Sequence, residues 1–328
     1  MTFFKAQNIS IDFGGIRAVD NISFDVEKGT IFTIVGPNGA GKTTIFNIIS
    51  RIYNLTDGRI IFEDKDITQL AAHQVVKLGI ARTFQNIELF DHATVLHNLL
   101  IGRHIHCRST FCSDLLFLPS VRRMELKHRR IVEDVIDFLD LQHYRDQLIQ
   151  NLPYGVRKVV ELGRALCTEP KLLLLDEPAS GLNVDETEDM SFWIDDIKKL
   201  LGITVMMVEH NMNLVSQVSD HVLAISYGEA LADGSPREVQ ENPDVIKAYL
   251  GNFHPGFIGL TGEPADLAAI AEHYRVKRVV LEQQNANVLF DHGYSLYLLN
   301  RQGEAEAVVL PGLPPEHIVA LLQELIAE

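Results

Sequence analysis

Three features that mark other classes of protein are missing from this chain of 328 residues: long apolar runs, many cysteines and an excess of basic residues. No apolar run approaches the roughly 20 residues of a membrane-spanning helix, so any spanning part of its machinery would come from other subunits. The first residues lack a charged segment followed by an apolar core, and we expect no signal peptide. The formal net charge of −15 offers no basic footprint for broad nucleic-acid binding.

The three cysteines, Cys107, Cys112 and Cys167, are too few for a disulfide framework and fit a reducing cytoplasm. His104 and His106 lie close to the first two along the chain, so this segment could hold a metal ion. The spacing matches no strong zinc template, which favours an ordinary surface loop. With 46% hydrophobic and 22% charged residues, the composition is that of a globular protein with room for one large domain and a smaller one.

Residues 36–44 read GPNGAGKTT and match the pattern G-x-x-x-x-G-K-[ST], in which glycines let backbone N–H groups approach a phosphate. The preceding residues 30–35 predict a buried strand and residues 44–50 predict a helix. In this context the motif binds a nucleoside triphosphate, with Lys42 reaching the β- and γ-phosphates and Thr43 ligating Mg²⁺. The residues expected to line the nucleotide are Gly36, Pro37, Asn38, Gly39, Ala40, Gly41, Lys42, Thr43 and Thr44.

Periodicity predicts an α/β core with a helical insertion. Alternating polar and apolar residues over 1–35 predict β-strands. Unbroken apolar runs at Lys171–Asp176 and Ile203–Val208 are typical of strands covered on both faces of a parallel sheet. Between the glycine-rich loop and these strands, residues 96–150 carry apolar side chains at helical spacing, interrupted at Pro119.

Two carboxylates, Asp176 and Glu177, end the first of these apolar strands. A carboxylate at the carboxyl end of a strand can hold Mg²⁺, directly or through water, which suits Asp176. Glu177 would face the γ-phosphate, where it could orient or deprotonate the attacking water. Such a pair is often only a strand end in an acidic loop, but its place downstream of the glycine-rich loop favours phosphate chemistry.

Taken in order, the motifs resemble those of the ABC-type ATPases across residues 1–252. The resemblance implies a P-loop NTPase fold of the ABC type with a helical subdomain at about residues 86–165. It also implies that Phe13 stacks on adenine, that Gln85 lies near Mg²⁺ and the lytic water, and that His210 contacts the γ-phosphate. Taken singly, a phenylalanine is usually a core residue, a glutamine a surface residue and a histidine one that is hydrogen-bonded locally. The order and spacing of the three favour their assignment to the site. The segments are Phe13, Gly36–Thr44, Arg82–Gln85, Leu152–Val156, Asp176–Glu177, Ser180–Asn183 and His210.

Four further features of the sequence resemble those of the LivG-type subunits of importers for branched-chain amino acids and related small solutes. The resemblance implies a peripheral subunit on the cytoplasmic face of the inner membrane. It would pair with a second ABC ATPase, identical or different, beneath two permease subunits that a solute-binding protein supplies. ATP and Mg²⁺ would be held between the P-loop of one ATPase and the signature of the other, and dimer closure would drive transport. The segments are Phe13–Val19, the helical insertion, Glu209–Val215 and Asn242–Gly251.

The signature departs from the family pattern, because Leu-Ser-Gly-Gly-Gln is here Leu152, Pro153, Tyr154, Gly155 and Val156. The serine hydroxyl and glutamine amide that would hold a partner's ATP are missing. Tyr154, Gly155 and the N-terminus of a helix expected from residue 157 remain as an anion site. A non-catalytic or regulatory cassette subunit is therefore one alternative. A soluble ABC ATPase not tied to transport is another, although it would need tandem cassettes or a coiled-coil insertion and a basic surface.

Residues 253–328 resemble a different family, the C-terminal half of the SCO/SenC proteins, which are thioredoxin-fold copper chaperones. His292 takes the place of that family's copper-binding histidine. The C-x-x-x-C motif is missing and no cysteine follows Cys167, so we expect no copper site. A partial sheet with an exposed edge is marginal alone. It could be a relic of gene fusion, which we favour, an accessory domain or a ligand sensor. The segments are Phe257–Pro264, a helix expected over 265–274, Asp291–His292, Tyr294–Asn300 and 311–322.

Overall fold

The computed structural model divides the chain into an N-terminal unit, residues 1–257, and a C-terminal unit, residues 258–328. Each unit is described by itself. The structure describes residues 2–107, 119–251, 278–284, 287–292, 296–299 and 305–309.

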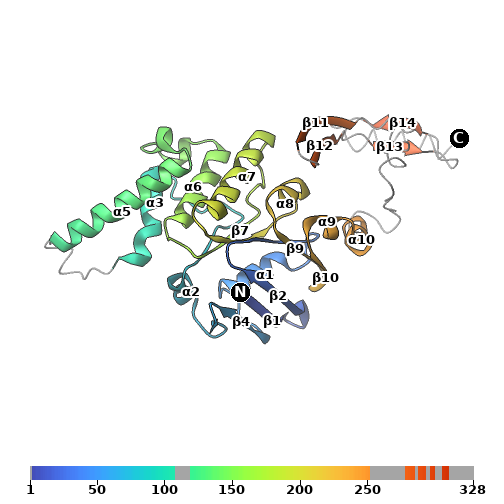
Figure 1. The fold of residues 1–328 in the computed structure, drawn as a ribbon, viewed down its shortest axis with the longest axis horizontal. Helices are drawn as coiled ribbons and strands as arrows, with labels where there is room; N and C mark the ends of the chain where they lie inside the picture. The colour runs from blue at the N-terminus through green and yellow to red at the C-terminus, as the bar shows by residue number, and fades with distance from the viewer. Residues whose placement is uncertain are drawn as a thin grey trace. The chain divides into compact units, whose positions relative to one another are not determined.

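A six-stranded sheet with the order β10-β9-β3-β8-β7-β6 forms the centre of the N-terminal unit (Figure 1). β9, β3, β8, β7 and β6 are parallel to their neighbours, and β10 pairs antiparallel at the edge. The expected parallel α/β sheet is thereby confirmed. The strands are β3 (Ile31–Val35), β6 (Ile80–Arg82), β7 (Leu172–Asp176), β8 (Thr204–Val208), β9 (His221–Ser226) and β10 (Glu229–Gly234).

The central strands are buried on both faces, which explains their unbroken apolar runs. In β7, Leu173 and Leu175 enter one hydrophobic core, whereas Leu172 and Leu174 enter a second core on the opposite face. The second core lies under a four-stranded antiparallel sheet, order β2-β1-β4-β5, and includes Phe46 of α1. The elements are β1 (Thr2–Phe13), β2 (Ile16–Glu27), β4 (Asp57–Phe62), β5 (Lys65–Asp66), α1 (Lys42–Ile49) and α2 (Ala72–Leu78).

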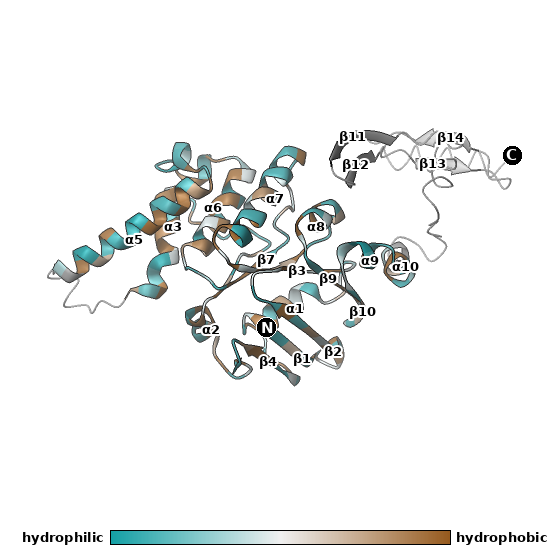
Figure 2. Cartoon of the chain, viewed as in Figure 1, coloured by the Kyte–Doolittle hydropathy of each residue, from teal (hydrophilic) through white to brown (hydrophobic). Residues whose placement is uncertain are grey.

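The first core is covered by the predicted helical region and by α7. α5 begins at Pro119, where the pattern predicted an interruption, and carries hydrophilic residues along much of its length (Figure 2). α6 begins at Tyr154, three residues before the expected start at Arg157, so that expectation was wrong. The elements are α3 (Val95–Gly102), η1 (Arg103–His106), α5 (Pro119–Phe138), η2 (Gln142–Tyr144), η3 (Ile149–Asn151), α6 (Tyr154–Leu166) and α7 (Val184–Lys199).

Three short helices complete the N-terminal unit: α8 (Met212–Val218), α9 (Pro236–Gln240) and α10 (Pro243–Gly251). Val239 of α9 and Val245 of α10 form a third small core with Val35 at the end of β3. The strand that leads into the glycine-rich loop is therefore supported from this side as well.

The described part of the C-terminal unit consists of two antiparallel strand pairs. β11 (Arg278–Gln284) pairs with β12 (Asn287–His292), and β13 (Leu296–Leu299) pairs with β14 (Ala305–Val309). His292 is the last residue of β12. The helix expected over 265–274 lies outside the described residues.

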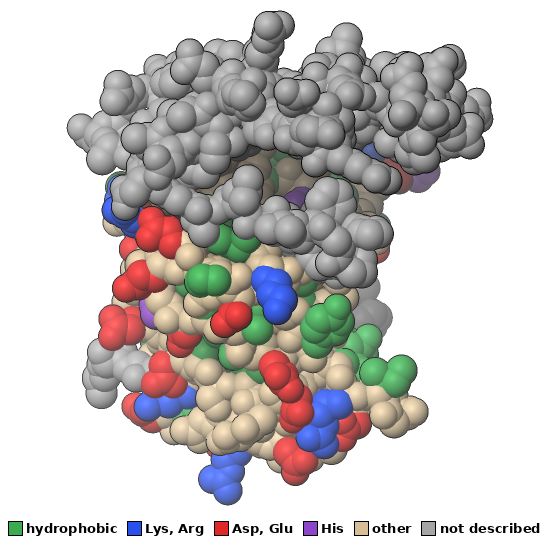
Figure 3. All heavy atoms as spheres, turned by 90° about the vertical axis from the view of Figure 1, so that its right-hand side faces the viewer, with side chains coloured by type: hydrophobic (Ala, Val, Ile, Leu, Met, Phe, Trp, Pro, Cys, Tyr) green, Lys and Arg blue, Asp and Glu red, His purple; other side chains and the backbone are tan. Residues whose placement is uncertain are grey.

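No helix in the described ranges combines the length and apolar character needed to cross a membrane. On the face in Figure 3, acidic and basic side chains of the described atoms are interspersed with hydrophobic ones. This mixed surface fits the negative net charge and offers no basic stripe on that face.

We expect Gly41→Ala to destabilise the N-terminal unit more than Gly39→Ala. Both glycines have a left-handed backbone, with φ of 104° and 81°. A Cβ on Gly41 would lie 2.7 Å from the carbonyl oxygen of Ala18, whereas a Cβ on Gly39 meets nothing within 4 Å. The difference isolates the steric overlap, about 1–3 kcal/mol, and is measured by urea unfolding without nucleotide. Equal destabilisation by the two variants would contradict it.

Candidate functional site

The glycine-rich loop joins β3 to α1 and wraps around the Lys42 ammonium. A Cβ on Gly36 would lie 2.2 Å from the carbonyl oxygen of Ile225, so only glycine fits there. Lys42 Nζ donates to the carbonyl oxygens of Gly36 at 2.7 Å and Pro37 at 2.9 Å. Burial lowers the pKa of Lys42, while the nearby carboxylates oppose that shift. The loop therefore presents a buried cation beside the free N–H groups of a helix N-terminus, which is a phosphate site.

Asp176 ends β7 as a buried carboxylate with one oxygen bound and one free. Arg82 donates to its Oδ2 at 2.7 Å, and its Oδ1 has no hydrogen-bond partner among the described residues. Burial raises the pKa of Asp176, and the ion pair with Arg82 partly offsets this. An unpartnered buried carboxylate oxygen suits a hard cation. The Asp176 carboxylate, the exposed Thr43 hydroxyl and the Gln85 amide oxygen together fit the oxygen donors that Mg²⁺ prefers.

Gln85, Glu177 and His210 lie together although they are far apart in sequence. Gln85 Nε2 donates to Glu177 Oε2 at 2.9 Å, and His210 Nδ1 lies 4.0 Å from the same oxygen. Glu177 has a left-handed backbone, with φ of 49°. A non-glycine residue in that conformation costs about 1–3 kcal/mol and is typical of functional positions. The strained backbone directs the carboxylate of Glu177 toward Gln85 and His210.

A second carboxylate, Glu209, was missed in the sequence and holds this cluster in place. It is fully buried and accepts three backbone N–H bonds, from Ala179 at 2.9 Å, His210 at 2.8 Å and Asn211 at 3.0 Å. These bonds fix the backbone on both sides of the cluster, since Ala179 follows the Glu177 strand end and His210 follows β8. The sequence signal that could have identified Glu209 is its position as a charged residue directly after an apolar strand.

Two buried charged side chains of α6, also missed in the sequence, contact the same loops. Lys158 Nζ donates to the carbonyl oxygens of Gln85 at 3.1 Å and Glu177 at 3.4 Å. Glu161 Oε1 accepts from the backbone N–H of Phe84 at 3.3 Å. Burial lowers the pKa of Lys158 and raises the pKa of Glu161. Lys158 and Glu161 are three positions apart and lie on the inner face of α6. Charged residues at these otherwise apolar positions were the sequence signal that could have identified them.

The signature residues contact the loop that follows Glu177 in the same chain. The Tyr154 hydroxyl donates to the Ser180 carbonyl oxygen at 3.4 Å. A Cβ on Gly155 would lie 2.3 Å from Glu186 Oε1, so a larger residue there would require the Glu186 side chain to move. Asn183 and Glu186 form a capping box at the start of α7. Tyr154 is half exposed at the first residue of α6, where it can meet another molecule.

Phe13 lies at the end of β1 with 42% of its surface exposed. Its ring makes an edge-to-face contact with Tyr53, at a centroid distance of 5.1 Å. One aromatic face remains available for stacking.

The histidine and cysteine segment around residue 106 is partly described. His106 Nε2 hydrogen-bonds the Thr168 carbonyl oxygen at 2.9 Å, and Cys107 Sγ lies 3.9 Å from His128 Nδ1. Among the described residues, no group of three metal-ligating side chains is gathered. Cys112 lies outside them.

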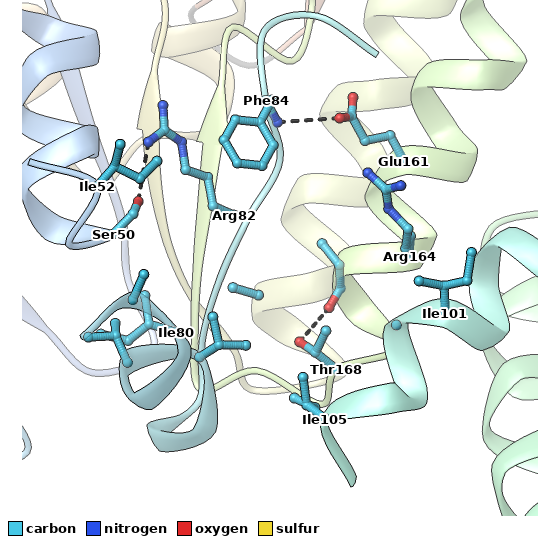
Figure 4. A pocket seen from close by; sticks show the side chains of 16 residues that line it. Ser50, Ile52, Ile80, Arg82, Phe84, Ile101, Ile105, Glu161, Arg164 and Thr168 are labelled. Atoms are coloured by element: carbon cyan, nitrogen blue, oxygen red, sulfur yellow. Dashed lines mark hydrogen bonds between the residues drawn. The ribbon is translucent and has the colours of Figure 1, made fainter. Parts of the chain in front are cut away.

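An apolar groove of about 350 Å³ lies between α2, α3, η1 and α6 (Figure 4). Ile52, Ile101 and Ile105 line it, and Phe84, one residue before Gln85, stands at its end. The Arg82 guanidinium lies 5.0 Å from the centroid of the Phe84 ring. The groove is thus connected to Asp176 through Arg82, the last residue of β6, and Phe84, two residues later.

Two family models match the chain. The model described as ABC transporter matches residues 19–180, and the model described as SCO1/SenC matches residues 239–327. Both resemblances noted in the sequence are confirmed. The SCO1/SenC match begins within α9, which packs in the N-terminal unit.

Curated relatives match the N-terminal unit over almost their whole length. The branched-chain amino acid transport ATP-binding protein BraF of Pseudomonas aeruginosa is 38% identical over 247 residues, covering 75% of this chain and 97% of that protein. LivG of Escherichia coli K12 is 37% identical over 247 residues, with the same coverage.

Among solved structures, the nucleotide-free ATP-binding cassette of an ABC transporter superposes with a TM-score of 0.68 at 33% identity. It covers 76% of this chain and 100% of its own length. The ADP conformation of an ATP-binding cassette also has a TM-score of 0.68 at 33% identity, covering 76% of this chain and 99% of that structure. The chain therefore belongs to the family of ABC transporter ATP-binding proteins.

Proposed function

We propose that the chain is the ATP-hydrolysing subunit of an importer for branched-chain amino acids or related small solutes. The observation that carries the proposal is the cluster of Gln85, Glu177 and His210 beside the glycine-rich loop and Asp176. BraF and LivG, which share over a third of their residues with it, are named as branched-chain amino acid transport proteins. The subunit would sit peripherally on the cytoplasmic face of the membrane.

In the proposed reaction, Phe13 stacks on adenine and the loop Gly36–Thr44 surrounds the phosphates. Lys42 exchanges its bonds to the carbonyl oxygens of Gly36 and Pro37 for bonds to the β- and γ-phosphates. Mg²⁺, which neutralises phosphate charge when bound, would be held by Thr43, Asp176 and Gln85.

Glu177 accepts the proton of the attacking water at its carboxylate, and the Gln85 amide keeps that carboxylate oriented. His210, anchored through its backbone N–H to Glu209, contacts the γ-phosphate. The new bond forms between the water oxygen and the γ-phosphorus, and the bond to the β,γ-bridging oxygen breaks. ADP and phosphate are the products.

Dimer formation would complete each site. Tyr154, Gly155 and the N-terminus of α6 would face the nucleotide of a second ABC ATPase, and that ATPase's signature would face the Lys42 site. Pro153 and Val156 leave this chain's signature without the serine and glutamine side chains. That departure is the observation that favours a second candidate, a cassette subunit with a regulatory rather than a catalytic role.

The groove beside Phe84 is proposed as the docking surface for a permease subunit. It is apolar, it lies in the N-terminal unit, and its end is one residue from Gln85. A cytoplasmic segment of the permease seated there would move with the Gln85 loop, and a solute-binding protein would act on the opposite side of the membrane. For the C-terminal unit we propose no copper chemistry, because no cysteine follows Cys167.

We expect Glu177→Gln to keep ATP binding and lower turnover by about 10²–10⁴-fold, because the amide cannot accept the water proton. Glu188→Gln, an exposed substitution of the same kind on α7, is the control and should leave turnover unchanged. Mg²⁺-dependent phosphate release is measured for the purified chain and for the assembled transporter, with dimer formation followed by size exclusion. Unchanged hydrolysis by Glu177→Gln would remove it as the base. Tight ATP binding without turnover in the wild-type assembly would favour the regulatory subunit.

Lys158→Met should lower kcat by about 10- to 100-fold while leaving the Kd for ATP and the Tm unchanged. The reason is that Lys158 binds the backbones of Gln85 and Glu177 but touches no expected phosphate position. Lys158→Arg should restore part of the activity, and Lys127→Met, on the exposed side of α5, serves as the control. A matching fall in Tm and kcat without rescue by arginine would indicate a purely structural role.

Ile101→Glu should weaken association with the permease by about tenfold or more and leave basal ATP turnover of the isolated chain unchanged, because it charges the apolar groove. Leu126→Glu, the control, charges another exposed apolar residue, on α5 and outside the groove. The two variants are compared by co-purification with the permease subunits and by turnover. Equal co-purification of both would show that the permease docks elsewhere.

A further inference from the structure

We propose that a cavity between α5, α6 and α7 binds a small organic cation with an apolar body. The cavity has a volume of about 440 Å³, within the range of pockets that take small molecules. The end of α5, α6 and α7, which lie in the same region of the N-terminal unit in Figure 1, contribute lining residues. It is separate from the glycine-rich loop and from the groove of Figure 4, and the inference goes beyond the proposed ATPase activity.

Aromatic side chains form much of the wall of this cavity. Phe138 ends α5, Tyr144 ends η2, and Phe192 and Trp193 are consecutive on α7. Phe192 is 60% exposed and therefore accessible from solvent. The negative face of an aromatic ring attracts a cation, most strongly when the ring is tryptophan. Such a wall accepts an ammonium group together with the hydrocarbon attached to it.

Carboxylates stand at the same cavity. Asp140, Asp189 and Asp196 line it, and none of them forms a salt bridge or a side-chain hydrogen bond with another described residue. On the same helix, Asp195 pairs with Lys198 and Lys199. Lys198 and Lys199 are thus held by Asp220 and Asp195, and Lys199 also interacts electrostatically with Asp196. Asp140 and Asp189 form no ion pair with another described residue. A positively charged ligand would complement this charge, whereas an anion would be repelled.

The altered signature also belongs to this cavity. Gly155 and Val156 line it at the start of α6, and Val156 stands where the family pattern has glutamine. Valine gives the cavity an apolar surface where a glutamine would bring an amide. Val156 is partly buried and also packs against the first core. A ligand here would touch α6 beside Tyr154, and so would reach the segment proposed to meet the partner's nucleotide.

The chain contains one tryptophan, Trp193, and it lines the cavity, so binding can be followed by intrinsic fluorescence. The full-length chain is titrated with benzyltrimethylammonium, and we expect a saturable change in tryptophan emission. The Asp189→Asn/Asp196→Asn double variant should bind about tenfold more weakly, because it removes two carboxylates and conserves size. The assay needs no nucleotide, so its outcome is independent of whether the chain hydrolyses ATP.

Asp134→Asn, on the exposed face of α5 and outside the cavity, is the matched control and should bind as the wild type does. Benzenesulfonate, an aromatic anion, should produce no saturable change. The proposal is overturned if benzyltrimethylammonium gives no saturable signal, if benzenesulfonate binds equally well, or if the double variant binds as tightly as the wild type. Circular dichroism of the double variant verifies that it is folded.

Discussion

The parallel register of β3, β8 and β7 is the constraint on which the site depends. Asp176 of β7 pairs with Val208 of β8, and Val208 pairs with Ile34 of β3. Because parallel strands end at the same edge of a sheet, the residues that follow these three strands are brought to one place. A shift of one residue in this register would turn the side chains of β7 into the wrong core and separate the carboxylates from the loop.

Much of this arrangement could be predicted because the sequence signals are local. Residues 36–44 and 172–177 carry their own strand and turn patterns, and the sheet follows from them. The start of α6 at Tyr154 was missed because Pro153 and Gly155 weaken a helix by propensity; in the structure Pro153 is the N-cap and lies outside the helix. The role of Lys158 could not be read from spacing, since its partners are carbonyl oxygens 73 and 19 residues away. Contacts of that length depend on the tertiary fold.

Buried charge is concentrated where the loops meet. Asp176, Glu209, Lys158 and Glu161 are all nearly inaccessible, and each is bound to a backbone group or to an opposite charge. Such groups are costly to bury and more costly to leave unpaired. The packing of α6 against the sheet therefore holds the positions of the Gln85 and Glu177 loops together. A change in the orientation of α6 would therefore displace both loops.

The small core around Val35 shows that the folded boundary of the N-terminal unit differs from the boundary of the SCO1/SenC match. Val239 and Val245 lie within the SCO1/SenC match, yet they pack beneath the residue that precedes Gly36. Residues 239–251 thus match the SCO1/SenC family model but fold as part of the N-terminal unit. A chain that ended where that match begins would lack Val239 and Val245, which pack against the strand leading into the glycine-rich loop. A truncation meant to keep the N-terminal unit folded should therefore end after α10, at the boundary of the folded unit and not at the start of the family match.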